Sequence, residues 1–333
     1  MKKFIAAAVV SAFALAMAMP GPASAAEKVS FGTDWLAQAE HGGFYQAVAD
    51  GTYAACGLDV TIVPGGPQVN NRALMLAGKL QFHMGGDMLQ AFFAVKEGIP
   101  LVAVAAVFQK HPQVIIAHPG EADKWEDLKN LKLLIGDQGY QSFYQWMIKE
   151  FGFTPEQRQP YTFNPAPFLV DKKMAMQGYL SSEPYVVEKE GGFKPKVFLL
   201  ADAGYSSYAT TIETMADTIK NKPDMVKCFV EGSIKGWYNY LYNDRTAADA
   251  MIIKDNPEMS DDKIAYAIAK MKEFATVESG DAEKMGIGVI TEARVKDFFD
   301  KMVAAGVISS DVNWRASFST EFVGKGVGLD LKK

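Results

Sequence analysis

Apolar positions along the chain follow two spacings, which predict strands alternating with helices. Short runs of β-branched and other apolar residues predict strands, and stretches that carry apolar residues on one face predict helices. This alternation favours an α/β fold. The expected strands are 29–32, 58–63, 82–84, 101–107, 114–117 and 131–136. The expected helices are 43–55, 70–77, 88–97, 142–151, 223–242, 247–256, 260–274 and 291–305, and the segments 161–163, 174–180 and 197–200 complete the alternation.

The first 25 residues have the pattern of a secretory signal peptide. Lys2 and Lys3 form a positive start, residues 4–19 are almost wholly apolar, and Ala23-Ser24-Ala25 supplies the small residues that signal peptidase needs. The apolar run is short for a membrane span. We therefore expect cleavage near Ala25 and export to the periplasm. The residue directly after the expected cleavage point is Ala26 and not a cysteine, so we expect no lipid anchor.

The length of the mature chain indicates two domains. About 308 of the 333 residues remain after cleavage, which is long for a single core. The pattern changes after His118-Pro119-Gly120 and again near Tyr208. We therefore expect a first lobe of residues 26–117 and 209–333, and a second lobe of residues 118–208. Two crossings between such lobes make a hinge, and the ligand cleft is expected beyond the carboxyl ends of the strands.

Charge and motif content exclude several functions. The formal net charge is −5 and both signs are mixed along the chain, so nucleic acid is not an expected partner. The sequence lacks G-x-S-x-G and H-E-x-x-H motifs, and its four histidines lack metal-ligand spacing. We therefore predict no enzyme, no metal site and no cofactor. Cys56 and Cys228 are expected to be two buried thiols, although an exported protein is able to pair them.

Candidate ligand contacts cluster in the loop after the first expected strand. Asp34 and Trp35 are followed by His41, Gly42 and, within the next helix, Tyr45. Trp35 offers a flat face on which a planar ligand can stack. His41 and the amide of Gly42 offer hydrogen-bond donors at a helix start. In the alternative interpretation, Trp35 covers the core and the glycines only form a tight turn.

Two further loops of the first lobe follow strands. In the segment 64–71, the glycines allow a close approach of the backbone, Pro67 is part of the turn, and Asn70 is a ligand contact or a helix cap. Asp87 either accepts hydrogen bonds from a ligand amine or caps the helix that begins at residue 88. The cap is favoured for Asp87.

The second lobe contributes two candidate loops. Gln138 and Tyr140 lie in segment 136–143, which follows an expected strand and opens a helix, as in a cradle for an anion or a polar group. The segment lacks the lysine and the spacing of a P-loop. Glu183 and Tyr185 lie in a second loop, where Glu183 either binds a ligand cation or ring N–H, or is a first-turn charge next to Pro184.

These stretches resemble the NMT1/THI5-like group of ABC-transporter substrate-binding proteins, which is close to the nitrate, sulfonate and taurine binders. The strongest segments are HGGFYQAVADGTYAACGLDV from His41, PGGPQVN from Pro64, QGYLSSEPYVVEKEGGF from Gln177 and GVITEARVKDFFDKMVAAGVI from Gly288. The resemblance implies a two-lobed type II periplasmic binding fold that closes on its ligand. It also implies a membrane permease and its ATPase as partners, and an aromatic ring placed against Trp35 or Tyr45.

The resulting hypothesis is a monomeric periplasmic binding protein for a small planar, nitrogen-containing organic solute. Pyrimidine-binding members carry an asparagine where this chain has residues 36–40, which argues against a thiamine-precursor pyrimidine. The chain also lacks the cysteine-rich motif of the yeast-type pyrimidine synthases. The alternatives are a sulfonate or nitrate binder, for which Arg72 is the one nearby arginine, a periplasmic enzyme acting on a vitamin precursor, and a sensor subunit.

Overall fold

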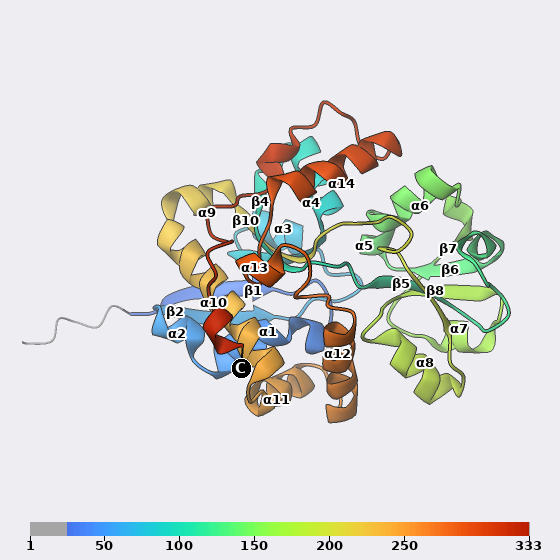
Figure 1. Cartoon of the computed structure of the whole chain (residues 1–333), viewed down its shortest axis with the longest axis horizontal. Coiled ribbons are helices and arrows are strands. Elements are labelled where there is room, and N and C mark those ends of the chain that lie inside the picture. Colours follow the sequence, from blue (N-terminus) through green and yellow to red (C-terminus); the bar gives the residue numbers. More distant parts are fainter. Residues whose placement is uncertain (1–24, 333) are drawn as a thin grey trace, which may run out of the picture.

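The computed structural model describes residues 25–332, so the expected signal peptide lies outside the described residues except for Ala25. Within this range the strands form two five-stranded sheets, each in its own lobe (Figure 1). The first sheet has the order β2-β1-β3-β10-β4 and the second has the order β7-β6-β8-β5-β9. The strands are β1 (Glu27–Gly32), β2 (Leu58–Val63), β3 (Phe82–Asp87), β4 (Leu101–Phe108), β5 (Gln113–Ala117), β6 (Lys132–Ile135), β7 (Arg158–Pro160), β8 (Met174–Tyr179), β9 (Lys196–Leu199) and β10 (Ala209–Met215). The α/β prediction is confirmed.

Helices cover both sheets. The expected helix 43–55 is divided into α1 and α2, because Gly51 between them has a left-handed φ of 74°. The long helix α10 begins at Pro223, where a proline costs no helical hydrogen bond. The helices are α1 (Gly42–Ala49), α2 (Thr52–Ala55), α3 (Asn71–Leu76), α4 (Met88–Lys96), α5 (Asp137–Tyr140), α6 (Phe143–Phe151), α7 (Ala166–Val170), α8 (Glu183–Gly191), α9 (Ala216–Asn221), α10 (Pro223–Tyr242), α11 (Thr246–Asp255), α12 (Asp261–Glu273), α13 (Ala282–Met285) and α14 (Glu292–Ala304).

Strand β10 returns to the first sheet after the whole second lobe. It pairs antiparallel with β3 on one side and with β4 on the other, and residues 209–214 are buried. The sequence pattern did not predict this strand, because four of its seven residues are Thr or Glu. Three of these four residues, Thr211, Glu213 and Thr214, have polar partners inside the protein. Glu213 Oε2 lies 3.0 Å from His83 Nε2, and Thr214 Oγ1 donates to the carbonyl of Gln81.

Strand β5 lies in the second sheet, where it pairs antiparallel with β8 and β9. The expected lobe boundary lies after Ala117. The strand pairing instead places the crossing between the sheets before Gln113. Two smaller expectations also change. Strand β3 continues through Gly85 and Gly86 to Asp87, and the strand expected at 161–163 is found at Arg158–Pro160.

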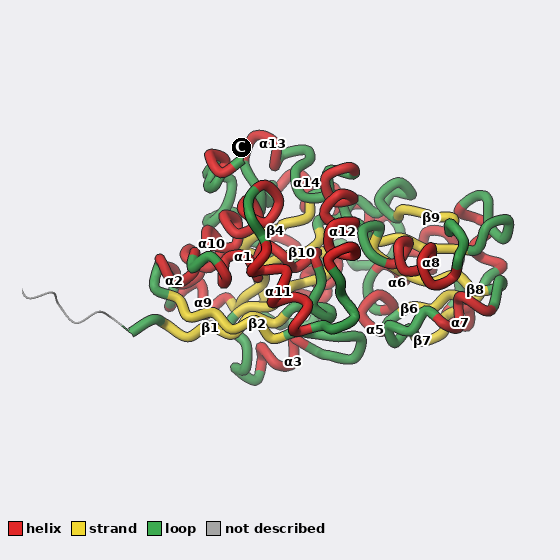
Figure 2. The backbone as a smooth tube through the Cα atoms, turned by 90° about the horizontal axis from the view of Figure 1, so that it is seen from below, coloured by secondary structure: helices red, strands yellow, loops and turns green. Residues whose placement is uncertain are grey.

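The hydrophobic core continues from one lobe into the other. Residues of α4 and α14 share a cluster of buried side chains with the second sheet and α6. Tyr205 stands at the junction, with its ring centroid 5.1 Å from that of Trp146 and 5.2 Å from that of Phe298. The two sheets lie towards opposite ends of the long axis (Figure 2). The lobes are therefore joined by packed side chains as well as by two chain crossings.

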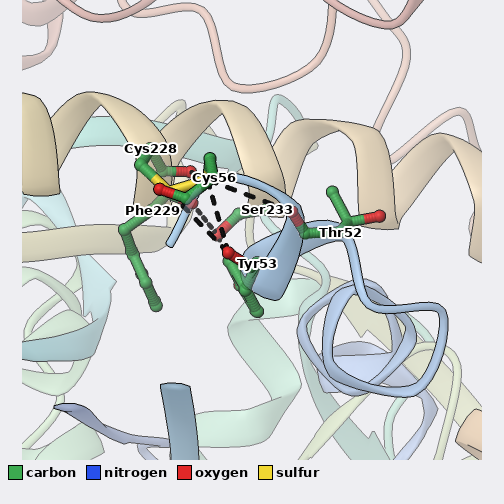
Figure 3. The surroundings of a disulfide bond; sticks show 6 residues. All are labelled: Thr52, Tyr53, Cys56, Cys228, Phe229 and Ser233. Carbon is green, nitrogen blue, oxygen red and sulfur yellow. Dashed lines mark hydrogen bonds between the residues drawn. A yellow bond between two sulfur atoms is a disulfide. The ribbon is translucent and has the colours of Figure 1, made fainter. Parts of the chain in front are cut away.

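Cys56 and Cys228 form a disulfide, so the expectation of two separate thiols was wrong (Figure 3). Cys56 ends α2, which packs on α10 with the Tyr53 ring stacked on Phe229 at 5.1 Å. The Tyr53 and Ser233 hydroxyl oxygens are 2.7 Å apart. This packing brings the two cysteine Cα atoms to 6.0 Å although 172 positions separate them in the sequence. Sequence spacing could not reveal that proximity.

Among residues 25–332, no helix is both long enough and apolar enough to cross a membrane.

Removing the disulfide is expected to lower the free energy of unfolding. The cross-link closes a loop of 172 positions, which restricts the unfolded chain, and such bonds contribute about 2–4 kcal/mol. We predict this loss for Cys56→Ser, measured by denaturant unfolding under non-reducing conditions. The double variant with Cys228→Ser should lose little more, because each single change already abolishes the bond. Equal stability of the wild-type protein with and without reductant would contradict the prediction.

Candidate functional site

A cavity lies between the two lobes, beyond the ends of several strands. Its empty space is about 640 Å³, including its opening to solvent. The first lobe contributes the loop after β1 and the start of α4, and the second contributes the end of β8 and the starts of α5 and α6. The described lining residues are Asp34, Trp35, Gln38, Gly86, Asp87, Gln90, His111, Gln113, Gly136, Gln138, Gly139, Ser142, Phe143, Gln177, Gly178, Tyr179 and Glu183. Such a concave space between lobes is a typical place for a small-molecule site.

Trp35 forms an aromatic wall of the cavity. Its loop is fixed by Thr33, whose hydroxyl donates to the Trp35 carbonyl at 2.9 Å and accepts from the amide of Gly65 at 3.1 Å. The indole reaches across the cleft, stacks on Tyr161 with ring centroids 6.4 Å apart, and meets the edge of Phe163 at 5.9 Å. Because Tyr161 and Phe163 belong to the second lobe, this wall is built from both lobes.

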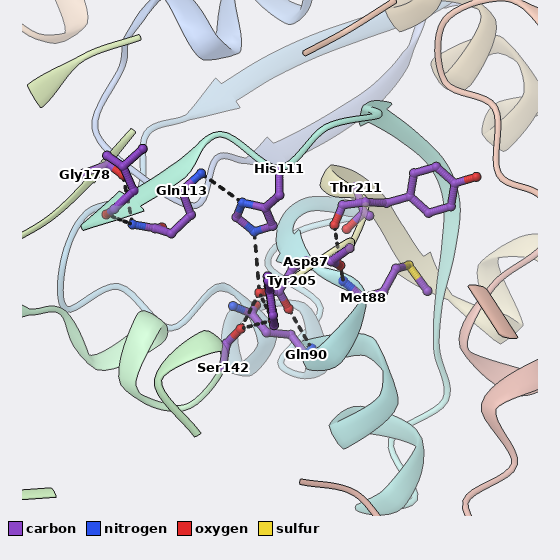
Figure 4. A network of polar contacts seen from close by, with 12 residues as sticks. Asp87, Met88, Gln90, His111, Gln113, Ser142, Gly178, Tyr205 and Thr211 are labelled. Carbon is purple, nitrogen blue, oxygen red and sulfur yellow. Dashed lines mark hydrogen bonds and ion pairs between the residues drawn. The ribbon is translucent and has the colours of Figure 1, made fainter. Parts of the chain in front are cut away.

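Asp87 is the centre of a buried polar network between the lobes (Figure 4). It caps α4 by accepting from the amide of Gln90 at 3.1 Å, and its Oδ2 accepts from Tyr205 at 2.9 Å and from Ser142. Burial raises the pKa of Asp87, but the interactions with His111 and the Ser142 hydroxyl outweigh burial, so the pKa lies below its ordinary value. The carboxylate therefore stays ionised inside the protein.

His111 is oriented by the backbone. Its Nδ1 accepts from the amide of Gln113 at 3.1 Å, which leaves the ring N–H on Nε2, 3.8 Å from Asp87 Oδ2. The Gln113 side chain donates in turn to the carbonyl of Gly178 at 2.9 Å. The first crossing between the lobes is therefore hydrogen-bonded to β8 through Gln113. Its His111 ring faces Asp87, the carboxylate that caps α4.

Glu183 is buried at the start of α8 and faces the cavity. Its Oε2 accepts from the amide of Tyr179 at 2.7 Å. Only glycine fits at Gly178, since a Cβ there would lie 2.7 Å from Glu183 Cβ. Burial raises the pKa of Glu183 to about 7, although the hydrogen bond from Tyr179 opposes the shift. Near neutral pH this carboxyl group is therefore partly protonated and able to donate as well as to accept a hydrogen bond.

Two further buried acidic residues, Asp34 and Glu40, lie at or beside the cavity. Asp34 lines the cavity, and Nε2 of the buried His41 lies 3.4 Å from its Oδ1. Neither ring nitrogen of His41 has a hydrogen-bond partner among the described residues. Glu40 is buried next to them and accepts a hydrogen bond from Ser181 of the second lobe. Burial raises the pKa of Glu40.

The predicted site residues fall into three groups. Those that line the cavity are Asp34, Trp35, Asp87, Gln138 and Glu183. Those that line a larger, more open cavity next to it are Pro67, Asn70, Tyr140 and again Gln138. Those outside both are His41, Gly42, Tyr45 and Tyr185.

The last group has clear structural surroundings. A Cβ at Gly42 would lie 2.0 Å from the ring of Tyr240, so glycine is needed for α1 to approach α10. Tyr45 is fully buried and donates to Asp255 at 2.9 Å. Tyr185 packs on Tyr266, with ring centroids 5.0 Å apart. Asn70 and Asp87 both cap helices, which was one of two open interpretations for Asn70 and the favoured one for Asp87.

Sequence reasoning missed several lining residues. His111 lies in the crossing between β4 and β5, Gln113 is the first residue of β5, and Gln177 lies inside β8. Their signal in the sequence is a polar residue at the edge of, or within, a strongly apolar run. The remaining lining residues that were not among the predicted contacts are Gln38, Gly86, Gln90, Gly136, Gly139, Ser142, Phe143, Gly178 and Tyr179.

A metal centre is not indicated. Within residues 25–332, no group of three or more His, Cys, Asp and Glu side chains is placed to hold an ion.

The family model described as NMT1/THI5 like matches residues 38–248, which is more than half of the chain. The chain belongs to the NMT1/THI5-like family. A riboflavin-binding protein, RibY, from Chloroflexus aurantiacus is 23% identical over 325 residues, covering 90% of this chain and 87% of that protein. This chain is thus a family member with a distant relative of known ligand.

Solved structures share the fold. The ligand-binding component of an ABC-type import system from Staphylococcus aureus has a TM-score of 0.63 at 12% identity, covering 89% of this chain and 97% of that one. The alkanesulfonate-binding protein SsuA from Xanthomonas axonopodis has a TM-score of 0.63 at 13% identity, covering 89% and 99%. The chain therefore has the periplasmic binding protein fold. The desulfurization enzyme DSZB is also similar, with a TM-score of 0.54, so the fold is compatible with both binding and catalysis.

The raised pKa of Glu183 predicts a pH-dependent stability. Its pKa is raised from an ordinary 4.5 to about 7, so its stabilising contribution is complete below pH 4.5 and is lost as the pH rises through 7. Glu183→Gln keeps the acceptor but cannot ionise. We expect the Tm of this variant minus that of the wild type to increase by several degrees between pH 5 and pH 8.

The matched control is Glu188→Gln, which changes an exposed glutamate of the same helix. Its Tm difference from the wild type should not vary over that pH range. If the Tm difference between Glu183→Gln and the wild type were equally independent of pH, the carboxyl group would not be ionising in the folded protein near pH 7.

Proposed function

We propose that this protein is the periplasmic solute-binding component of an ABC importer and that its interlobe cavity binds a small planar nitrogen heterocycle. Membership of the NMT1/THI5-like family and the fold shared with import-system binding components support the transport role. The observation that carries the choice of ligand is the chemistry of the cavity wall. Its described residues include three carboxyl groups, five glutamines and an aromatic face, and none is Lys or Arg.

The aromatic face suits a flat ring. Trp35 presents an indole that is only partly buried, and Tyr161 and Phe163 support it from the second lobe. A ring stacked on Trp35 would be held by both lobes at once, because the indole lies between them. Stacking of this kind contributes about 0.5–1.5 kcal/mol beyond the burial of surface. It also favours the closed arrangement, since only that arrangement brings the second-lobe rings to Trp35.

The polar wall suits a ligand with N–H donors as well as acceptors. Asp34 offers a carboxylate, and Glu183, with a pKa of about 7, is able to donate as well as accept. Each glutamine amide likewise has one acceptor and two donor hydrogens. The edge of a nitrogen heterocycle, in which ring N–H groups alternate with carbonyl or imine acceptors, complements such a wall.

An anionic solute is less well matched. Helix N-termini attract anions, but in this cavity the protein's own carboxylates already occupy two of them. Asp87 caps α4, and Glu183 stands in the first turn of α8. A sulfonate or nitrate would face these carboxylates without a lysine or arginine among the described lining residues. The alkanesulfonate bound by SsuA is therefore a poorer guide to the ligand of this chain than the riboflavin bound by RibY, which carries a planar fused ring.

Transport would follow from closure of the lobes. A ligand that contacts Trp35 and Asp34 of the first lobe together with Gln138 and Glu183 of the second binds the closed form more tightly than an open one. The closed form is then the species that the permease and its ATPase recognise. We propose a binding role without turnover, as in the import-system binding components that share this fold.

A thermal-shift screen of ligand-free protein tests this proposal. The panel contains uracil, adenine and lumichrome as planar heterocycles, and methanesulfonate and nitrate as anions. A heterocycle at about 100 times its Kd should stabilise the protein by roughly 2.7 kcal/mol and raise the Tm by several degrees. Trp35→Ala should abolish the shift, and Trp35→Phe should keep part of it.

Tyr185→Ala is the matched control, because it removes an aromatic ring that lies outside the cavity. It should leave the ligand-induced shift unchanged. A shift with the anions alone, insensitive to Trp35→Ala, would refute the heterocycle site.

A further inference from the structure

A second, larger cavity adjoins the first. Its empty space is about 1860 Å³, including open solvent. Gln90 of α4 and Gln138 of α5 line both cavities, so the two spaces meet between these side chains. Loop 66–70 and α3 form one side, in the first lobe, and α5 and the start of α6 form the other, in the second lobe. A ligand seated in the inner cavity can therefore extend a substituent outward between the lobes.

Side-chain amides are the most frequent polar groups in the lining of the outer cavity. Its described lining includes seven of them, together with the hydroxyl group of Tyr140. The seven amides are Gln68, Asn70, Asn71, Gln90, Gln138, Gln141 and Gln145. An amide both donates and accepts, and so does an alcohol. A wall of this kind matches a chain of hydroxyl groups better than it matches an apolar or a purely accepting substituent.

The charges at the outer cavity balance. Arg72 and Lys96 are opposed by Glu97 and Asp137. Arg72 is already engaged, since it donates to the carbonyl of Gln90 at 2.9 Å and lies 3.8 Å from Glu97. Asp137 is paired with Arg158. Among the described lining residues, Lys96 is the one cation that these pairs leave over, and it is exposed, so the wall itself favours an uncharged substituent.

We infer that the ligand is a planar heterocycle carrying an uncharged polyhydroxylated substituent, a sugar or a sugar alcohol, which lies in the outer cavity. This inference rests on the proposed function, because it needs the heterocycle in the inner cavity as its anchor. The outer cavity then determines which derivatives of the heterocycle are bound.

Calorimetric titration of matched ligand series tests the inference. The series are lumichrome, riboflavin and riboflavin 5′-phosphate, and uracil, uridine and uridine 5′-phosphate. In each series the ring is shared while a polyhydroxylated substituent and then a phosphate are added. In the series whose ring binds, the hydroxylated member should bind at least tenfold more tightly than the ring alone. The phosphate should give no further gain.

The double variant Gln68→Ala/Gln141→Ala removes one exposed amide of the outer cavity from each lobe. It should reduce the tenfold gain to less than threefold and leave the affinity for the bare ring unchanged. Asn221→Ala, an exposed amide at the end of α9, is the control and should change neither affinity.

The outcomes separate this inference from the proposed function. Equal affinity for the bare ring and its hydroxylated derivative would overturn the inference and leave the heterocycle site intact. Tighter binding of the phosphate member than of the uncharged one would overturn the charge argument. If no member of either series bound, the proposed function and the inference would fall together.

Discussion

The carboxylate of Asp87 joins the parts of this molecule that make its central cavity. It ends β3, caps α4, and accepts hydrogen bonds from Ser142 of the second lobe and from Tyr205 in the second crossing. Inside a protein such a charge is costly unless it is fully hydrogen-bonded. Its several donors come from distant segments, so the charge is stable only when those segments are assembled. The same carboxylate therefore lines the cavity and holds the two lobes in contact.

The hydrogen-bonding chemistry of the cavity depends on the positions of its carboxyl groups. Two helix starts that would attract an anion are compensated by Asp87 and Glu183, and the walls between them are amides and aromatic rings. Burial then divides the roles of the two carboxyl groups. Asp87 is kept ionised by its donors, whereas burial dominates at Glu183 and brings its pKa to about 7. A structural charge and an adaptable hydrogen-bonding group therefore face the same small space.

Much of the site could be predicted from a simple rule. Asp34, Trp35, Asp87 and Gln138 were chosen because they follow expected strands, and all four line the cavity. The same rule covers His111, which follows β4 and was overlooked, but it fails for Gln113 and Gln177, which lie within strands of the second sheet. It also favoured Gly42 and Tyr45, whose local pattern looks like a binding loop but which are buried by packing against α10 and α11.

The sequence by itself determined the α/β class, most of the strands and helices, the loops that carry Trp35 and Asp87, and the NMT1/THI5-like resemblance, because these depend on residues close together in the chain. Tertiary structure alone decided the pairing of β10 with β3 and β4, the place of β5 in the second sheet, and the Cys56–Cys228 bond. Each joins segments far apart in the sequence, up to 172 positions for the disulfide. Local spacing carries no information on such contacts, since they form only when the packing of both lobes brings the segments together.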